Sequence, residues 1–188
     1  RRQRQMCIRD RVYINSGIWE IVLTPRKIIS GNYAMWLPSE NVLNPGTAFL
    51  FPTETGTLTI PSTASRTIGV GAYDALTFSY VDFSGRGQRG AGRLSKPDIV
   101  APGVNVTAPT TSGTYASFSG TSFATPFVTG GAALMMEWGI IKENDPYLYG
   151  EKVKAYMQRG ARPLPGFTEY PNPQVGYGAL CVRDSIPI

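Results

Sequence analysis

The first third of the chain alternates short apolar runs with turn signals. Four runs rich in β-branched and aromatic residues, each four to seven residues long, predict short strands. Gly, Pro, Asn and Ser separate the runs and mark turns between them. Strands this short and this regularly spaced predict an antiparallel sandwich or meander. The four runs are Ile18–Thr24, Tyr33–Leu37, Thr47–Phe51 and Thr57–Ile60.

After Pro61 the pattern changes to compact apolar strands followed by helices. Such an order of strands and helices predicts an α/β sheet, so we place a domain boundary near Pro61. The predicted strands are Arg66–Gly71, Leu76–Val81, Asp98–Gly103 and Val104–Thr107.

Two helices complete the predicted α/β part. Almost no polar residue interrupts Ser122–Trp138, which predicts a helix buried on all sides. Pro126 falls in its first turn, where a missing N–H costs little. Asp145 and Pro146 predict the N-cap and first residue of a second helix, which ends at Gly160. Its mixed faces predict a surface helix.

Composition and charge exclude several classes of protein. Of 188 residues, 42% are hydrophobic and 16% charged, which indicates a globular protein. No apolar run reaches the roughly 20 residues of a membrane span, and no signal-peptide pattern follows the basic start. The first eleven residues carry +4 of the net charge of +5. A nucleic-acid binder carries its basic residues on a folded face, so we expect no nucleic-acid partner.

Residues 1–11 are set aside as a non-native basic tail, because Met6–Arg11 resembles the translation of a sequencing adapter. We therefore expect a β-rich insert over 12–60 and an α/β part over 61–188. The chain has no His, and its two cysteines have no metal-ligand spacing. We expect no metal and no cofactor.

The stretch that carries chemistry begins at Ser119. A glycine turn places the hydroxyl of Ser122 at the very start of the first predicted helix. Free backbone N–H groups at that end can hold a developing oxyanion, and the helix dipole favours negative charge there. A serine at a helix start is also a common N-cap. Position alone therefore leaves a purely structural interpretation of Ser122 open.

The residues around Ser122 closely resemble the serine motif of the subtilases, the subtilisin-like (S8-type) serine proteases. That motif, Gly-Thr-Ser-x-Ala-x-Pro-x-Val-x-Gly, is complete in this chain. Phe123 and Phe127 stand where the family often has Met and His, and we interpret them as packing variants because both keep bulk and apolarity. The seven matching residues are Gly120, Thr121, Ser122, Ala124, Pro126, Val128 and Gly130.

The resemblance covers about Pro61 to Leu180, with further matches at Phe83–Gly87, Lys96–Asn105 and Gly176–Ala179. It implies the C-terminal half of a parallel-sheet α/β domain. It also implies Ser122 as the nucleophile and the Ser122 backbone N–H as an oxyanion donor, with peptides or proteins as substrates.

The β-rich part resembles the inserted β-domain of the Csp-type subtilases, the spore-germination proteases of clostridia and their relatives. Gly31–Pro38 and Thr57–Thr63 carry this likeness. The subgroup implies a secreted or spore-associated bacterial protein, and some of its members are pseudoproteases that have lost triad residues.

The rest of the family's machinery has no match in the chain. In subtilases the base is a His, held by an Asp, and both precede the serine. The chain has no His and no segment that resembles the one supplying the family's oxyanion Asn. Asp98 matches a structural Asp of the family instead, and Asp74 and Asp82 match the triad Asp no better. We expect this chain to be a fragment of a longer enzyme and inactive alone.

Three functional hypotheses remain open at this point. The first is a serine endopeptidase whose parent protein forms an acyl-enzyme on Ser122. The second is a regulatory or binding pseudoprotease that keeps the subtilase fold without hydrolysis. The third is a β-sandwich binding module that carries the motif by accident.

Overall fold

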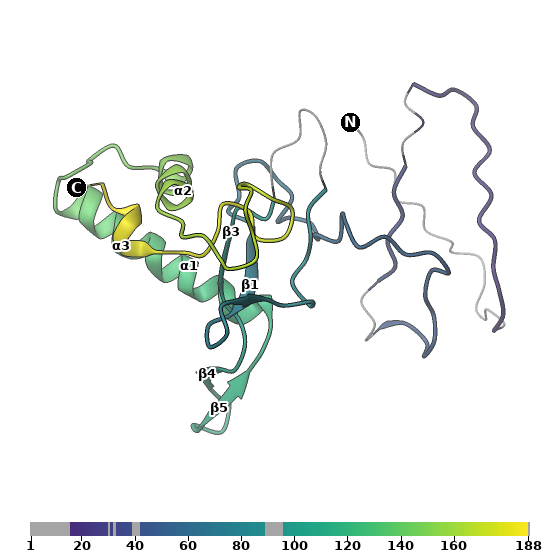
Figure 1. Ribbon diagram of the computed structural model, residues 1–188, viewed down its shortest axis with the longest axis horizontal. Helices are drawn as coiled ribbons and strands as arrows, with labels where there is room; N and C mark the ends of the chain where they lie inside the picture. Colours follow the sequence, from purple (N-terminus) through teal and green to yellow (C-terminus); the bar gives the residue numbers. More distant parts are fainter. Residues whose placement is uncertain (1–15, 30, 32, 39–41, 89–95, 188) are drawn as a thin grey trace. The chain divides into compact units, whose positions relative to one another are not determined.

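The computed structural model describes residues 16–29, 31, 33–38, 42–88 and 96–187. The chain divides into two compact units, Arg1–Leu37 and Pro38–Ile188, which we describe separately. All helices and strands of the described residues belong to the second unit (Figure 1). In chain order they are β1 (Val70–Asp74), β2 (Ser79–Tyr80), β3 (Ile99–Pro102), β4 (Val106–Pro109), β5 (Tyr115–Phe118), α1 (Thr121–Met136), the π-helical turn η2 (Glu137–Ile141), α2 (Gly150–Arg159) and α3 (Val182–Ser185).

A three-stranded sheet in the order β2-β1-β3 forms the centre of the second unit. β1 and β3 are parallel, with Val70 opposite Ile99, and β2 is antiparallel to β1. A parallel bridge between Val100 and Ala179 continues the sheet beyond β3, where the Leu180 N–H donates to the Val100 carbonyl at 2.8 Å. β4 and β5 form a separate antiparallel hairpin.

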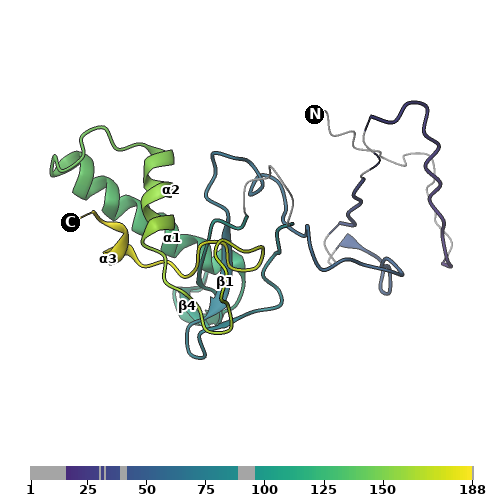
Figure 2. The ribbon, with the colours of Figure 1, turned by 45° about the horizontal axis from the view of Figure 1, so that its top comes forward.

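Both faces of the sheet are covered, which explains the continuous apolar run of β3. Ile99 packs in one core cluster with Ala124 and Val128 of α1. Val100 points the other way and packs in a second cluster with Val175. Helices α1 and α2 therefore cover one face, and the segment after α2 covers the other. Figures 1 and 2 show α1 running beside the strands with α2 packed next to it.

The expected α/β fold with a parallel sheet is confirmed, although strand boundaries differ. The predicted strand Leu76–Val81 shortens to β2 because a tight turn occupies its first half. In that turn the Asp74 carboxylate accepts the Leu76 N–H at 2.8 Å, and Phe78 has a left-handed φ of 53°. β1 and β4 lie two to four residues beyond their predicted positions, and β5 is missing from the prediction.

The four strands predicted before Pro61 are wrong for the described residues, which form no strand there. Large apolar side chains in this part stay in solvent, including Ile18 at 85%, Ile29 at 92% and Phe51 at 92% exposure. An extended run becomes a strand only where another backbone pairs with it and a surface covers its apolar face. The division into an insert over 12–60 and an α/β part over 61–188 stays a prediction.

Helix α1 is not buried on all sides, contrary to the prediction. Its buried residues form one stripe, with an exposed apolar face that includes Phe127 at 44% and Leu134 at 56%. The stripe follows the spacing of a single helix face and consists of Ala124, Val128, Gly131 and Met135.

Among the described residues, α1 and the other helices are all too short or too polar to span a bilayer.

Helix α2 begins later than predicted. Tyr149 is its N-cap residue, and Asp145 lies in the loop before it. The Asp145 carboxylate does not cap the helix; it accepts the Lys152 ammonium at 2.6 Å and the Tyr156 hydroxyl at 3.1 Å. A charged partner on the helix surface thus replaces the predicted cap. The predicted end at Gly160 is confirmed.

Candidate active site

Ser122 lies near the carboxyl ends of the two parallel strands. Gly103 directly follows β3, and its N–H donates to the carbonyl of Tyr73 in β1 at 3.0 Å. The Gly120 N–H in turn donates to the Gly103 carbonyl at 2.8 Å, which ties the start of α1 to this edge. In open α/β sheets, functional sites form outside the carboxyl ends of the strands.

Glycine is required at both positions of this connection. A Cβ on Gly103 would lie 2.6 Å from the Ala72 Cβ and 3.1 Å from the Gly120 carbonyl oxygen. Gly120 has a φ of 152°, which side chains disfavour. The glycine turn of the motif therefore lets α1 begin in close contact with the sheet.

The Ser122 side chain is exposed and does not cap α1. Gly120 is the N-cap residue, and no side chain forms a capping hydrogen bond at the start of the helix. The N–H groups of Phe123 and Ala124 donate to the Gly120 carbonyl at 3.0 and 3.3 Å. Within the described residues, neither the Oγ nor the backbone N–H of Ser122 has a hydrogen-bond partner. The N-cap interpretation is therefore wrong, and a hydroxyl and a backbone donor both remain open.

No base is hydrogen-bonded to this hydroxyl in the part of the chain that the structure describes. The first turn of α1 carries no acidic residue, and the chain has no His. Nor does the described part of the chain bring together three Cys, Asp or Glu side chains that would hold a metal ion. Within the described residues, the start of α1 thus carries a hydroxyl and a backbone N–H, both of Ser122, that have no hydrogen-bond partner.

Asp98 has the structural role that the sequence comparison predicts. Its carboxylate is buried and accepts the Gly69 N–H at 2.7 Å, the Lys154 ammonium at 2.8 Å, the Gln158 amide at 3.1 Å and the Lys96 ammonium. Burial lowers the pKa of Lys96, while the bond to Asp98 opposes that shift. This cluster ties the start of β3 to α2, so Asp98 is fully engaged in packing.

The other two carboxylates considered for the triad also have structural partners. Asp74 closes the β1–β2 turn, and Asp82 pairs with Arg86 at 3.1 Å. Within the described residues, none of these three carboxylates is hydrogen-bonded to the Ser122 hydroxyl.

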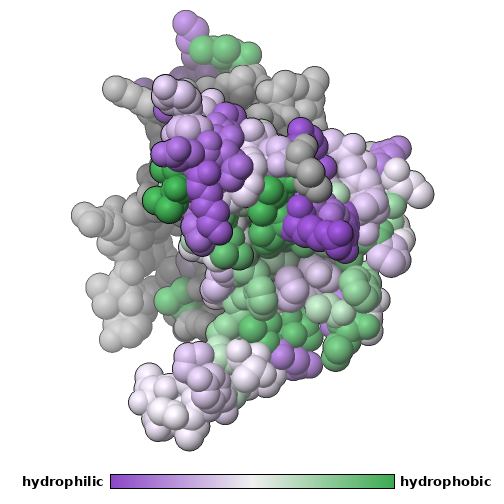
Figure 3. All heavy atoms as spheres, turned by 90° about the vertical axis from the view of Figure 1, so that its left-hand side faces the viewer, coloured by the Kyte–Doolittle hydropathy of each residue, from purple (hydrophilic) through white to green (hydrophobic). Residues whose placement is uncertain are grey.

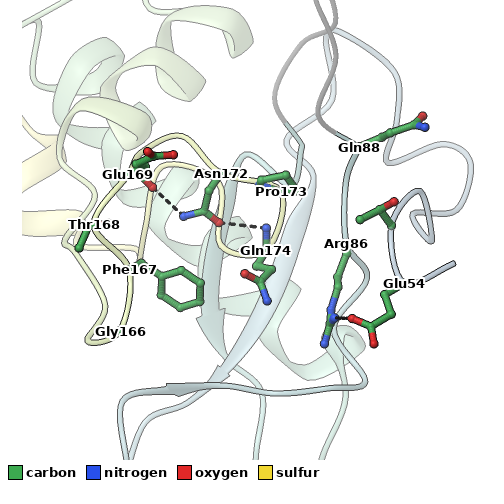
Figure 4. A pocket seen from close by; sticks show the side chains of 11 residues that line it. Glu54, Arg86, Gln88, Gly166, Phe167, Thr168, Glu169, Asn172, Pro173 and Gln174 are labelled. Carbon is green, nitrogen blue, oxygen red and sulfur yellow. Dashed lines mark hydrogen bonds and ion pairs between the residues drawn. The ribbon is translucent and has the colours of Figure 1, made fainter.

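A surface pocket lies apart from Ser122, between residues 54–55 and 86–88 on one side and 166–174 on the other (Figure 4). Arg86 donates to Glu54 at 2.6 Å across its first wall. On the second wall the Asn172 amide donates to the Glu169 carbonyl and accepts the Gln174 N–H. The pocket lining contains no serine or cysteine, and Ser122 lies outside it.

Sequence reasoning missed the residues that hold the motif in place. The Phe118 and Phe123 rings stack with centroids 4.9 Å apart and planes at 9°. The Ser119 hydroxyl accepts the Asn105 N–H at 3.0 Å. The glycine turn separates the two rings, and the β4–β5 hairpin separates Asn105 from Ser119. The local sequence pattern therefore does not indicate either pair. The only local signal is an aromatic residue on each side of Gly120.

Comparison with known proteins places this geometry in a family. The sequence model of the subtilase family matches residues 30–178. Subtilisin Savinase of Lederbergia lenta is 37% identical over 109 residues, which cover 58% of this chain and 35% of that protein. The solved structure of the CspB protease of Clostridium perfringens is 45% identical, with a TM-score of 0.73, and the match covers 76% of this chain and 30% of that one.

A second solved structure, the prenylagaramide maturation protease PagA, is 31% identical with a TM-score of 0.59; the match covers 71% of this chain and 46% of PagA. The chain thus spans less than half of each of these relatives. The likeness to CspB confirms the resemblance to Csp-type subtilases. With a family match over residues 30–178 and the motif serine at the carboxyl edge of a parallel sheet, the chain belongs to the subtilase family.

Proposed function

We propose that Ser122 is the nucleophile of a serine-type endopeptidase, and that a longer protein containing this chain is the active enzyme. The observation that carries the proposal lies at the start of α1. There the Ser122 hydroxyl is exposed and forms no capping hydrogen bond, and the Ser122 N–H has no partner among the described residues. A residue that served only as a helix cap would bond to the first turn.

The reaction follows from these two groups. The Ser122 Oγ attacks the carbonyl carbon of a peptide bond and passes its proton to a base, while the Ser122 N–H stabilises the oxyanion. Collapse of the intermediate breaks the C–N bond, and the base gives its proton to the departing amine. Water then attacks the ester on Ser122 in the same way and releases the acid.

We infer that residues 1–188 alone do not hydrolyse peptides, because no imidazole is available in the chain. Loss of triad members lowers kcat by about 10⁴ to 10⁶, and loss of one oxyanion donor lowers it by about 10² to 10³. The missing base would come from residues outside this chain.

The second candidate function is a pseudoprotease that binds peptides or a partner protein without cleaving them. The absence of His from the chain is the observation that favours it. An Asp and a His in their subtilase contexts elsewhere in the full-length protein would support the endopeptidase, and their loss would support the pseudoprotease.

Fluorophosphonate labelling of the full-length protein separates the two functions. We expect the label on the peptide that contains Ser122, no label after Ser122→Ala, and peptide hydrolysis in that variant lowered by about 10⁶. Ser117→Ala removes an exposed hydroxyl from β5 and should change neither result. A folded full-length protein that stays unlabelled at Ser122 would leave the pseudoprotease as the function.

A further inference from the structure

Three interactions of the described residues position the segment from Phe118 to Phe123, which carries Ser122. The Gly120 N–H bonds to the Gly103 carbonyl, and the Ser119 hydroxyl accepts the Asn105 N–H. The third point is the stack of Phe118 on Phe123, at 4.9 Å and nearly parallel. Phe118 ends β5, and Phe123 lies in the first turn of α1, so the rings join the strand and the helix on either side of Ser122.

The start of α1 is held by the burial of Ala124 in the core cluster, but it lacks the usual supports of a helix N-terminus. No side chain caps it, and it carries no acidic residue to interact with the helix dipole. Pro126 has no N–H, so the Ser122 carbonyl lacks its ordinary helical partner four residues on. Gly120, the residue on which the turn pivots, has the widest backbone freedom of any residue type.

One edge of the Phe123 ring lies beside Gly120. A Cβ on Gly120 would be 3.6 Å from the Phe123 Cδ2, which is van der Waals contact. If Phe118 holds this ring in place, the ring limits the rotation of the glycine turn and with it the direction of the Ser122 N–H. The stack thus lies at the end of α1 where a capping side chain would otherwise fix the first turn.

We propose that Phe118 and Phe123 are positioning residues whose stacked rings hold the Ser122 hydroxyl and N–H in reactive geometry. This inference rests on the proposed function of Ser122. The feature belongs to this chain, because Phe123 stands where the serine motif of the family often carries Met. An oxyanion donor acts only when it is aimed at the developing charge, and misplacement by about 1 Å costs about 10²-fold in rate.

The test is fluorophosphonate labelling of the full-length protein with Phe118→Leu. We expect the first-order inactivation rate constant to fall by about 10- to 100-fold, with little change in the inhibitor constant for initial binding. Phe118→Tyr keeps the ring and should restore the rate to within about 3-fold, on the same geometric argument. Phe127→Leu is the matched control, because Phe127 lies one turn further along α1 and is 44% exposed.

A double variant shows whether the two rings act as a pair. Phe123→Leu alone removes the same stack, so Phe118→Leu with Phe123→Leu should be no slower than the slower single variant. Multiplied losses would mean that the rings act independently, which would overturn the proposal. An unchanged rate in folded Phe118→Leu, or an equal loss in Phe127→Leu, would overturn it as well.

Hydrogen exchange keeps this inference separate from the proposed function. In Phe118→Leu we expect faster amide exchange in peptides that span Phe118–Ala124, and unchanged exchange in α2. If fluorophosphonate does not label the wild-type protein but Phe118→Leu still shows this local change in exchange, Ser122 is not the nucleophile and the stack remains a structural support. A labelled protein with no local change would refute the stack alone.

Discussion

Asp145, in the loop before α2, forms an ion pair with Lys152, and we expect the stabilising effect of this pair to depend on pH. Its hydrogen bond from Lys152 holds the pKa of Asp145 below the ordinary value of 3.8, and Asp145 raises the pKa of Lys152 above 10.5. A lowered carboxyl pKa stabilises the fold above about pH 3.8, and this contribution is lost as the pH falls through the folded pKa. A raised lysine pKa stabilises below about pH 10.5, and that contribution is lost as the pH rises further.

We therefore expect Asp145→Asn to lower the melting temperature at pH 7, and the difference from wild type to shrink below pH 3.8 and above pH 10.5. Melting curves across this pH range check the expectation. Glu137→Gln is the control, because the Glu137–Lys142 pair is 3.5 Å long and more than half exposed on both sides. A constant difference at all pH values would contradict the assigned ion pair.

At the scale of elements, α2 and α3 meet at Gly160. Its φ of −86° is ordinary, so the requirement for glycine here is space. A Cβ on Gly160 would lie 2.5 Å from the Asp184 carbonyl carbon and closer still to the Ser185 nitrogen. Because both are backbone atoms, α3 would have to move. We expect Gly160→Ala to destabilise the protein by about 1–3 kcal/mol in denaturant unfolding.

Gly150, at the start of the same helix, is the matched control. A Cβ there meets nothing within 4 Å, and alanine favours the helix more than glycine does. Gly150→Ala should therefore be neutral or stabilise by up to about 1 kcal/mol. If both substitutions have the same sign, the close approach of α2 and α3 is not what selects glycine at position 160.

At the scale of the whole molecule, the second unit exposes several large apolar side chains. Phe127, Leu134, Met136 and Ile141, on α1 and η2, are 44–75% exposed. Figure 3, which looks from the side where α1 ends, shows hydrophobic side chains in the middle of that face between hydrophilic ones. Exposed apolar surface promotes association.

We expect the 188-residue chain to self-associate and to bind the dye ANS. Sedimentation velocity should show concentration-dependent species, and Leu134→Gln with Ile141→Gln should shift them toward the monomer. The matched control is Tyr115→Ser, which removes an exposed aromatic residue from the β4–β5 hairpin, away from α1. A monomer with cooperative unfolding and no ANS signal would contradict this expectation.

The features that could be predicted from the sequence are those set by neighbours in the chain. The motif from Gly120 to Gly130 identified the family and the candidate nucleophile, because its residue types and spacing are complete locally. Pro126 in the first turn and the end of α2 at Gly160 also follow from local backbone rules.

Other features depend on residues far apart in the sequence. Asp145 was expected to cap a helix, but the fold brings Lys152 and Tyr156 to it, and a charged partner outcompetes a cap. The apolar runs before Pro61 have strand composition yet no strand partner among the described residues. The stack of Phe118 on Phe123 exists because the glycine turn brings the end of β5 close to the start of α1. Composition and spacing identify Ser122 as the candidate nucleophile, whereas packing between distant segments decides its exposure and the hydrogen bonds and ring contacts around it.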